Sequence, residues 1–141
     1  MPGWQFTPLP LEALDSLTQG SRRYLSEIGL PTGVELWLAG FSFGSAMMLR
    51  AAACDDRVRA LVAAGVPVSN YDFTGIAQCH KPKLFVHGSL DQFGSPEDLE
   101  GLFALLDEPK QLKIIQGADH FFEGHLPELA AAISAFIASI H

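Results

Sequence analysis

Three residues that together could activate a serine each follow an apolar segment of this sequence. Ser42 is the centre of a Gly-Phe-Ser-Phe-Gly pentapeptide at 40–44, Asp91 comes next along the chain, and His120 follows it. A serine hydroxyl is a weak nucleophile at neutral pH and needs a base within hydrogen-bond distance. Imidazole can take that proton and return it to a leaving group, and a carboxylate orients the imidazole and stabilises its cation. The three residues therefore predict nucleophilic acyl transfer.

The pentapeptide fits the G-x-S-x-G pattern, in which a serine lies on a sharp turn between a strand and a helix. The apolar segment Val34–Ala39 before it is typical of a buried strand, and Ser45–Ala53 after it is typical of a helix. Glycines on both sides of the serine leave room for a strained turn and for close packing of helix against strand. The backbone N–H of Phe43, at the start of this helix, is predicted to donate to a developing oxyanion.

Other carboxylates and imidazoles compete for the two supporting roles. Asp98 follows Ser95 and Pro96, which predicts a place in the first turn of a helix. Asp119 is adjacent to His120, and neighbours along a chain usually point apart, so a role in stabilising the loop is favoured. His87 lies inside a predicted strand and is expected to be a packed core residue. The remaining histidines have surface-like sequence contexts: His80, His125 and His141.

Phenylalanines surround the predicted acid and base in the sequence. Phe93, Phe121 and Phe122 could line a pocket for an acyl group, or they could be ordinary core residues. The five histidines show no HExxH or i, i+4 spacing, and the chain has no G-x-G-x-x-G. We therefore expect neither a metal nor a cofactor.

Apolar periodicity and turn residues divide the chain into alternating helices and strands, after an irregular lead-in at 1–10. Ser95 and Pro96 predict a helix start, whereas Asp55 and Asp56 are expected to form a solvated turn. This alternation predicts a single α/β domain over 1–141, with a mostly parallel sheet of about four strands and helices on both faces. Ser42, Asp91 and His120 then emerge at the carboxyl ends of strands, where sites gather in such sheets. The expected helices are Leu11–Ile28, Ser45–Ala53, Leu99–Leu106 and Pro127–Ile140, and the expected strands are Val34–Ala39, Val58–Val68, Lys83–His87 and Gln111–Gln116.

Composition excludes several other classes of protein. Of the 141 residues, 48% are hydrophobic and the formal net charge is −7, without any cluster of Lys or Arg, which argues against nucleic acid or an anionic membrane as partner. The first residues show no signal-peptide pattern, and the apolar segment Leu129–Ile140 is too short to span a bilayer. Cys54 and Cys79 have no metal or CxxC spacing and are expected to be free buried thiols. We expect a cytoplasmic protein.

Taken together, the pentapeptide, the segment His-Gly-Ser-Leu-Asp at 87–91 and the segment Gly-Ala-Asp-His-Phe-Phe at 117–122 resemble the α/β-hydrolase superfamily. The closer similarity is to its small bacterial hydrolases without a lid, of the dienelactone-hydrolase and peptidase-like type. This resemblance implies a nucleophile at Ser42, an acid at Asp91 and a base at His120. It implies a serine hydrolase acting on small carboxylic esters, with thioesters and amides as open alternatives.

The resemblance runs from about Leu11 to the C-terminus and covers only the second half of that fold. Family members usually carry earlier strands and a loop that supplies a second oxyanion donor. Without them, strand 34–39 becomes an exposed edge, which leaves three explanations: a truncated reading frame, pairing with a second chain, or a rearranged N-terminal segment. We expect a homo-oligomer formed through that edge, or another contact that covers it. The alternative function is a catalytically impaired remnant that acts as a binding or interaction module.

Overall fold

The computed structural model describes residues 9–53 and 55–140, so the first eight residues, Cys54 and His141 lie outside the described part. Helices and strands alternate along the chain, as the sequence predicts. The elements are α1 (Leu11–Glu27), β1 (Leu36–Phe41), α2 (Phe43–Ala52), β2 (Val58–Ala64), the 3-10 turn η1 (Thr74–Ile76), β3 (Lys83–Gly88), α3 (Pro96–Leu105), β4 (Lys110–Ile115) and α4 (Leu126–Ser139).

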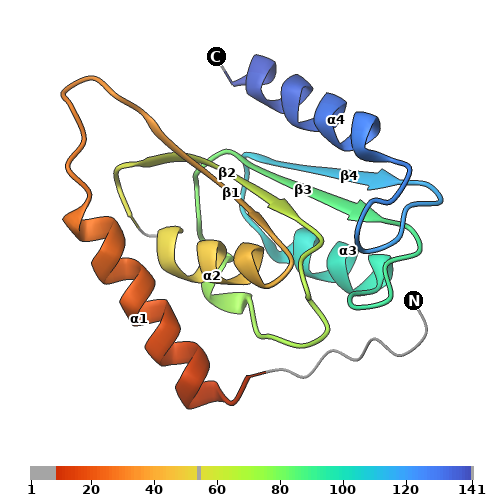
Figure 1. Cartoon of the computed structure of the whole chain (residues 1–141), viewed down its shortest axis with the longest axis horizontal. Helices are drawn as coiled ribbons and strands as arrows, with labels where there is room; N and C mark the ends of the chain where they lie inside the picture. The colour runs from red at the N-terminus through yellow and green to blue at the C-terminus, as the bar shows by residue number, and fades with distance from the viewer. Residues whose placement is uncertain (1–8, 54, 141) are drawn as a thin grey trace.

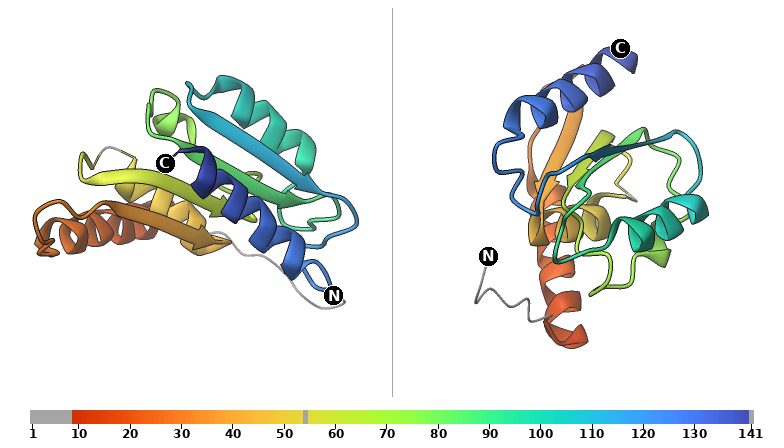
Figure 2. Two further views of the ribbon diagram at one scale, coloured as in Figure 1. Left: turned by 90° about the horizontal axis from the view of Figure 1, so that it is seen from above. Right: turned by 90° about the vertical axis from the view of Figure 1, so that its right-hand side faces the viewer.

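The four strands form one parallel sheet in the order β1-β2-β3-β4. Helix α4 covers one face over β3 and β4, whereas α2 and α3 lie on the other face (Figure 1). Helix α1 packs against α2 at the outside of that second layer (Figure 2). The fold is therefore α/β with helices on both faces of a parallel sheet, which confirms the predicted fold class.

Two apolar clusters fill the space on either side of the sheet. Every residue of β3 is buried, because this strand has a neighbour on each side and a helix layer over each face. On the α2 side, Leu49, Leu61 and Phe85 are buried together, and on the α4 side Val86 and Phe136 are buried together. This double layer holds the carboxyl ends of the strands in fixed positions relative to one another.

Most boundaries agree with the predicted ones, with two informative differences, and the exposure of one helix face differs as well. Strand β1 begins and ends two residues later than predicted, so it runs directly to the residue before Ser42. Strand β2 ends at Ala64 rather than Val68, because Gly65 takes a positive φ of 62° and turns the chain. In α1, Leu17 and Tyr24 are 46% and 69% exposed, although their spacing predicts a buried face. The reason is that α1 contacts chiefly α2, so α2 covers only a narrow stripe of the α1 surface.

The expected solvated turn at Asp55 and Asp56 is wrong for Asp55. Its carboxylate accepts hydrogen bonds from the backbone N and the guanidinium of Arg57 and pairs with Arg57 Nη2 at 2.8 Å. The same guanidinium donates to the carbonyls of Leu25 and Ile28 at the end of α1. The hydrogen bond from Arg57 holds the pKa of Asp55 below its usual value. This ion pair ties α1 to the start of β2.

Strand β1 is an edge strand, as predicted: within the described residues it pairs with β2 alone. No charged residue lies between Leu36 and Phe41, and Phe41 is 45% exposed. Edge strands of this kind are usually protected by charge, proline or a covering element.

Over residues 9–53 and 55–140, no helix is both long and apolar enough to span a membrane.

Candidate active site

Ser42 occupies a strained turn between β1 and α2. Its backbone has φ 54° and ψ −124°, a combination of angles that residues other than glycine rarely adopt. The Ser42 N–H donates to the carbonyl of Ala64 at 2.9 Å, which ties the turn to the end of β2. The serine therefore lies at the carboxyl edge of the sheet, at the N-terminus of α2.

The two glycines of the pentapeptide have different roles. A Cβ added at Gly40 would lie 2.7 Å from backbone atoms of Gly44 and Ser45, so only glycine lets α2 approach β1 this closely. A Cβ added at Gly44 would meet no atom within 4 Å. The prediction that close packing requires glycine on both sides of Ser42 is thus right for Gly40 and wrong for Gly44, which faces open space.

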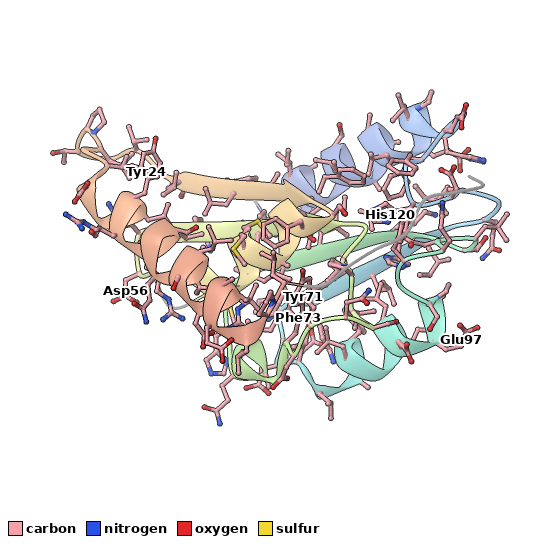
Figure 3. The ribbon with its side chains drawn as sticks, turned by 60° about the horizontal axis from the view of Figure 1, so that its bottom comes forward. Tyr24, Asp56, Tyr71, Phe73, Glu97 and His120 are labelled. Carbon is pink, nitrogen blue, oxygen red and sulfur yellow. The ribbon has the colours of Figure 1, made fainter. Side chains whose placement is uncertain are left out.

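The structure brings Ser42, Asp91 and His120 into one chain of hydrogen bonds. Ser42 Oγ lies 2.8 Å from His120 Nε2, and His120 Nδ1 lies 2.8 Å from Asp91 Oδ2. A carboxylate oxygen only accepts, so Nδ1 of His120 carries the hydrogen and Nε2 is free to accept the serine proton. The side chain of Asp91 is fully buried and that of His120 is 3% exposed. Figure 3 labels His120 at the end of the molecule opposite Asp56, where the strands end.

A tight turn after β3 holds Asp91. Its Oδ1 accepts the backbone N–H groups of Phe93 at 2.8 Å and Gly94 at 3.0 Å, and its own N–H donates to the carbonyl of Gly88. Because Oδ1 is occupied by two amides, Oδ2 is left to face His120.

The competing residues lie where the sequence places them. Asp98 is in the first turn of α3, where its N–H donates to the Ser95 hydroxyl. Asp119 Oδ1 accepts the N–H groups of Phe121 and Glu123 and closes the loop that carries His120. His87 is fully buried in β3, as expected. Asp91 is therefore the carboxylate that reaches His120.

Aromatic rings surround the His120 imidazole. Phe93 and Phe121, the predicted substrate contacts, have ring centroids 4.8 Å and 5.2 Å from it. Phe41, at 5.2 Å, completes the group, although sequence reasoning assigned it no contact with the base. Phe122 is 1% exposed and belongs to the apolar cluster under α4, so its ring packs in the core. The three rings exclude water from His120 and present apolar surface at the edge of the site.

Gln92 was also missed by the sequence analysis. Its Oε1 accepts the backbone N–H of His120 at 3.2 Å, so the loop after β3 holds the loop after β4 through this contact. No motif marks such a residue, because its partner is a backbone atom 28 positions away. Gly65 is another example: a Cβ there would lie 3.2 Å from His120 Cε1.

The amide of Phe43 is available to an anion by its position in the helix. Phe43 is the first residue of α2, and N–H groups of the first turn have no acceptor within their own helix. The partial positive charge of a helix N-terminus favours a negative ligand next to Ser42. In the described part of the chain, no three His, Cys, Asp or Glu side chains form a group that could hold a metal ion.

Comparison with known protein families finds a match over most of the chain. The model of the alpha/beta hydrolase domain matches residues 9–128. An uncharacterized protein of Rickettsia prowazekii (strain Madrid E) is 30% identical over 111 residues, which cover 73% of this chain and 47% of that protein. The chain therefore spans about half the length of this curated relative.

Solved structures with the same fold include a serine hydrolase and a serine hydrolase homologue. A lidless α/β serine hydrolase from Xanthomonas campestris has a TM-score of 0.67 at 26% identity, over 89% of this chain and 54% of that one. An α/β serine hydrolase homologue from Coxiella burnetii has a TM-score of 0.66 at 25% identity, over 99% of this chain and 65% of that one. In both cases the present chain corresponds to less than two thirds of the other protein.

Proposed function

The chain belongs to the alpha/beta hydrolase domain family, and on this premise we propose that it is a serine hydrolase. The reaction is hydrolysis of small carboxylic esters through an acyl-Ser42 intermediate. The observation that carries the proposal is the continuous chain of two 2.8 Å hydrogen bonds from Ser42 through His120 to Asp91.

Acylation begins when Ser42 Oγ attacks the ester carbonyl carbon and its proton passes to His120 Nε2. The carbonyl oxygen takes the negative charge and accepts a hydrogen bond from the N–H of Phe43. Asp91 stabilises the imidazolium through Nδ1–H without taking the proton itself. As the tetrahedral intermediate collapses, His120 Nε2–H protonates the alkoxide, and the alcohol leaves.

Deacylation repeats these steps with water as the nucleophile. His120 Nε2 takes a proton from a water molecule, the hydroxide adds to the acyl carbon, and Ser42 Oγ leaves with the proton that His120 returns. The products are the carboxylic acid and free Ser42. Exclusion of water by Phe41, Phe93 and Phe121 strengthens the hydrogen bond between His120 and buried Asp91.

Small esters are favoured over long lipids by the shape of the site. Phe93 and Phe121 offer apolar contact beside His120, but the neighbouring Leu90 is 66% exposed and Phe41 is 45% exposed. A site with open walls buries little of a long acyl chain, so it gains little affinity from chain length. Thioesters would react through the same groups.

A second candidate is a catalytically impaired binding module, favoured by the match to only about half of the relatives' length. Removal of one oxyanion donor from a serine hydrolase costs on the order of 10²–10³ in rate, so an impaired enzyme of this kind would still turn over ester slowly.

Turnover of p-nitrophenyl acetate by the wild type and by Ser42→Ala separates the two candidates. The hydrolase proposal expects turnover that depends on Ser42, measured as p-nitrophenolate release at equal protein concentration. Equal rates for the two proteins would leave only the binding module.

A further inference from the structure

His87 is a fully buried imidazole that the proposed reaction does not use. It is the next-to-last residue of β3, the strand that leads to the loop with Asp91, and its side chain has no exposed surface. Its Nε2 lies 2.6 Å from the carbonyl oxygen of Gly94 and 3.5 Å from Asp91 Oδ2. One ring nitrogen therefore reaches both ends of the turn that holds the predicted acid.

The other ring nitrogen of His87 is buried with no hydrogen-bond partner among the described residues. A buried polar atom without a partner costs free energy, so an apolar ring of the same shape would fill this place at lower cost. The carbonyl of Gly94 can only accept, so Nε2 carries the hydrogen and donates it. What distinguishes histidine from an apolar ring here is this single N–H.

That N–H acts on the turn formed by residues 91–94. The amide of Gly94 donates to Asp91 Oδ1 while the carbonyl of the same residue accepts from His87, so Gly94 is held from both sides. Gly94 also packs closely on the segment that follows β2: a Cβ there would lie 2.8 Å from the carbonyl oxygen of Val66. The turn is therefore close-packed against this segment on one side, and the His87 N–H holds it toward β3 on the other.

We propose that His87 is a positioning residue for the reaction assigned above: it clamps the turn at Gly94, and the turn fixes the direction in which Asp91 faces His120. This inference rests on the proposed function for its effect on rate, but the clamp itself is a property of the fold. Without the N–H of His87, Gly94 moves and Oδ1 loses an amide. Asp91 then rotates, and its hydrogen bond to His120 Nδ1 lengthens.

Paired variants isolate the N–H from the packing of the ring. In His87→Gln, the side-chain amide nitrogen occupies the place of Nε2 and can still donate to Gly94. In His87→Asn, the amide is too short to reach that carbonyl, and His87→Phe keeps the ring shape without a donor. Phe85→Leu is the matched control, because Phe85 is also fully buried in β3 but belongs to the apolar cluster on the α2 side of the sheet.

The first readout is the downfield proton resonance of the hydrogen bond between His120 Nδ1 and Asp91, recorded by NMR and assigned by its loss in His120→Gln. We expect it unchanged in His87→Gln and Phe85→Leu, and shifted or broadened in His87→Asn and His87→Phe. The second readout is kcat and KM for p-nitrophenyl acetate. A misplaced catalytic group costs up to about 10²-fold, so kcat falls by roughly 10- to 100-fold in the Asn and Phe variants, with KM within about twofold.

The comparison of His87→Gln with His87→Asn decides the matter, because both replace the ring by an amide and the two side chains differ only in length. Equal kcat values and equal resonances for these two would overturn the clamp. If the wild type turned over no ester, the proposed function would fail, while the resonance would still decide whether His87 positions Asp91. A kcat for Phe85→Leu as low as that for His87→Asn would show that general loosening of the core, rather than the N–H, causes the effect.

Discussion

Adding one methyl group at Gly40 tests how closely the strand and the helix must approach at the candidate nucleophile. The Cβ of Gly40→Ala would lie 2.7 Å from the carbonyl carbon and oxygen of Gly44 and from Cα of Ser45. These are backbone atoms, which cannot rotate away. Ordinary contact begins at 3.4 Å, so the end of β1 and the start of α2 must separate by about 0.7 Å.

This separation acts directly on Ser42, which lies between the two elements. Its Oγ is 2.8 Å from His120 Nε2, and a displacement of about 0.7 Å brings the distance close to 3.5 Å, beyond the usual hydrogen-bond range. Overpacking of this kind costs about 1–3 kcal/mol of stability. We expect Gly40→Ala to lose that much in urea unfolding and to lose about 10- to 100-fold in p-nitrophenyl acetate turnover.

Gly44→Ala is the matched control on the other side of Ser42. A Cβ there meets no atom within 4 Å, and Gly44 is in the first turn of α2, where alanine has the better helix propensity. Its stability is expected within about 0.5 kcal/mol of the wild type, or higher, with turnover retained. Equal stability and equal turnover in Gly40→Ala and Gly44→Ala would refute the argument from close packing.

Three further variants test other parts of the account. Asp91→Asn keeps an oxygen for the amides of Phe93 and Gly94 but removes the charge that faces His120. The kcat for p-nitrophenyl acetate should therefore fall on the order of 10³- to 10⁴-fold, with the free energy of unfolding little changed. A kcat near that of the wild type would contradict the role of Asp91. Because the pKa of Asp55 is lowered in the folded state, its ion pair stabilises the protein above the ordinary carboxyl range and is lost as pH falls below about 4. The wild type should thus exceed Asp55→Asn in urea-unfolding free energy at pH 7, and the difference should shrink toward pH 3; a difference that stays constant with pH would contradict this cause. Finally, we propose that the β1 edge pairs with a second copy of the chain. Light scattering should then give the mass of a dimer for the wild type and of a monomer for Ala39→Lys, which adds a charge at an exposed position of β1. A monomeric wild type at concentrations well above micromolar would contradict this pairing.

Local sequence pattern predicts the elements and the order of the site residues. Turn residues such as Ser95 and Pro96 predict the start of α3, where the Ser95 hydroxyl accepts the N–H of Asp98. Parallel alternation then implies that Ser42, Asp91 and His120 meet at one edge of the sheet. The geometry of G-x-S-x-G is likewise local, since it depends on the backbone at Ser42 and on the close approach at Gly40.

The remaining features depend on contacts between distant segments, which spacing does not encode. Gln92 holds His120 through a backbone amide, and His87 reaches a carbonyl seven residues away across a turn. Lys83 is fully buried because its Nζ donates to the carbonyls of Lys81, Asp107 and Pro109, and burial lowers the pKa of its ammonium group. No local motif predicts that three carbonyls will surround one lysine.

An activated Ser42 should react with a fluorophosphonate, which forms a covalent adduct on nucleophilic serines. The measurement is intact mass after incubation of the wild type, Ser42→Ala and His120→Gln with the same reagent. We predict a single adduct on the wild type, none on Ser42→Ala, and greatly slowed labelling of His120→Gln, because the base 2.8 Å from Oγ is gone. An unlabelled wild type that is folded by circular dichroism, or equal labelling of Ser42→Ala, would contradict the activation of Ser42.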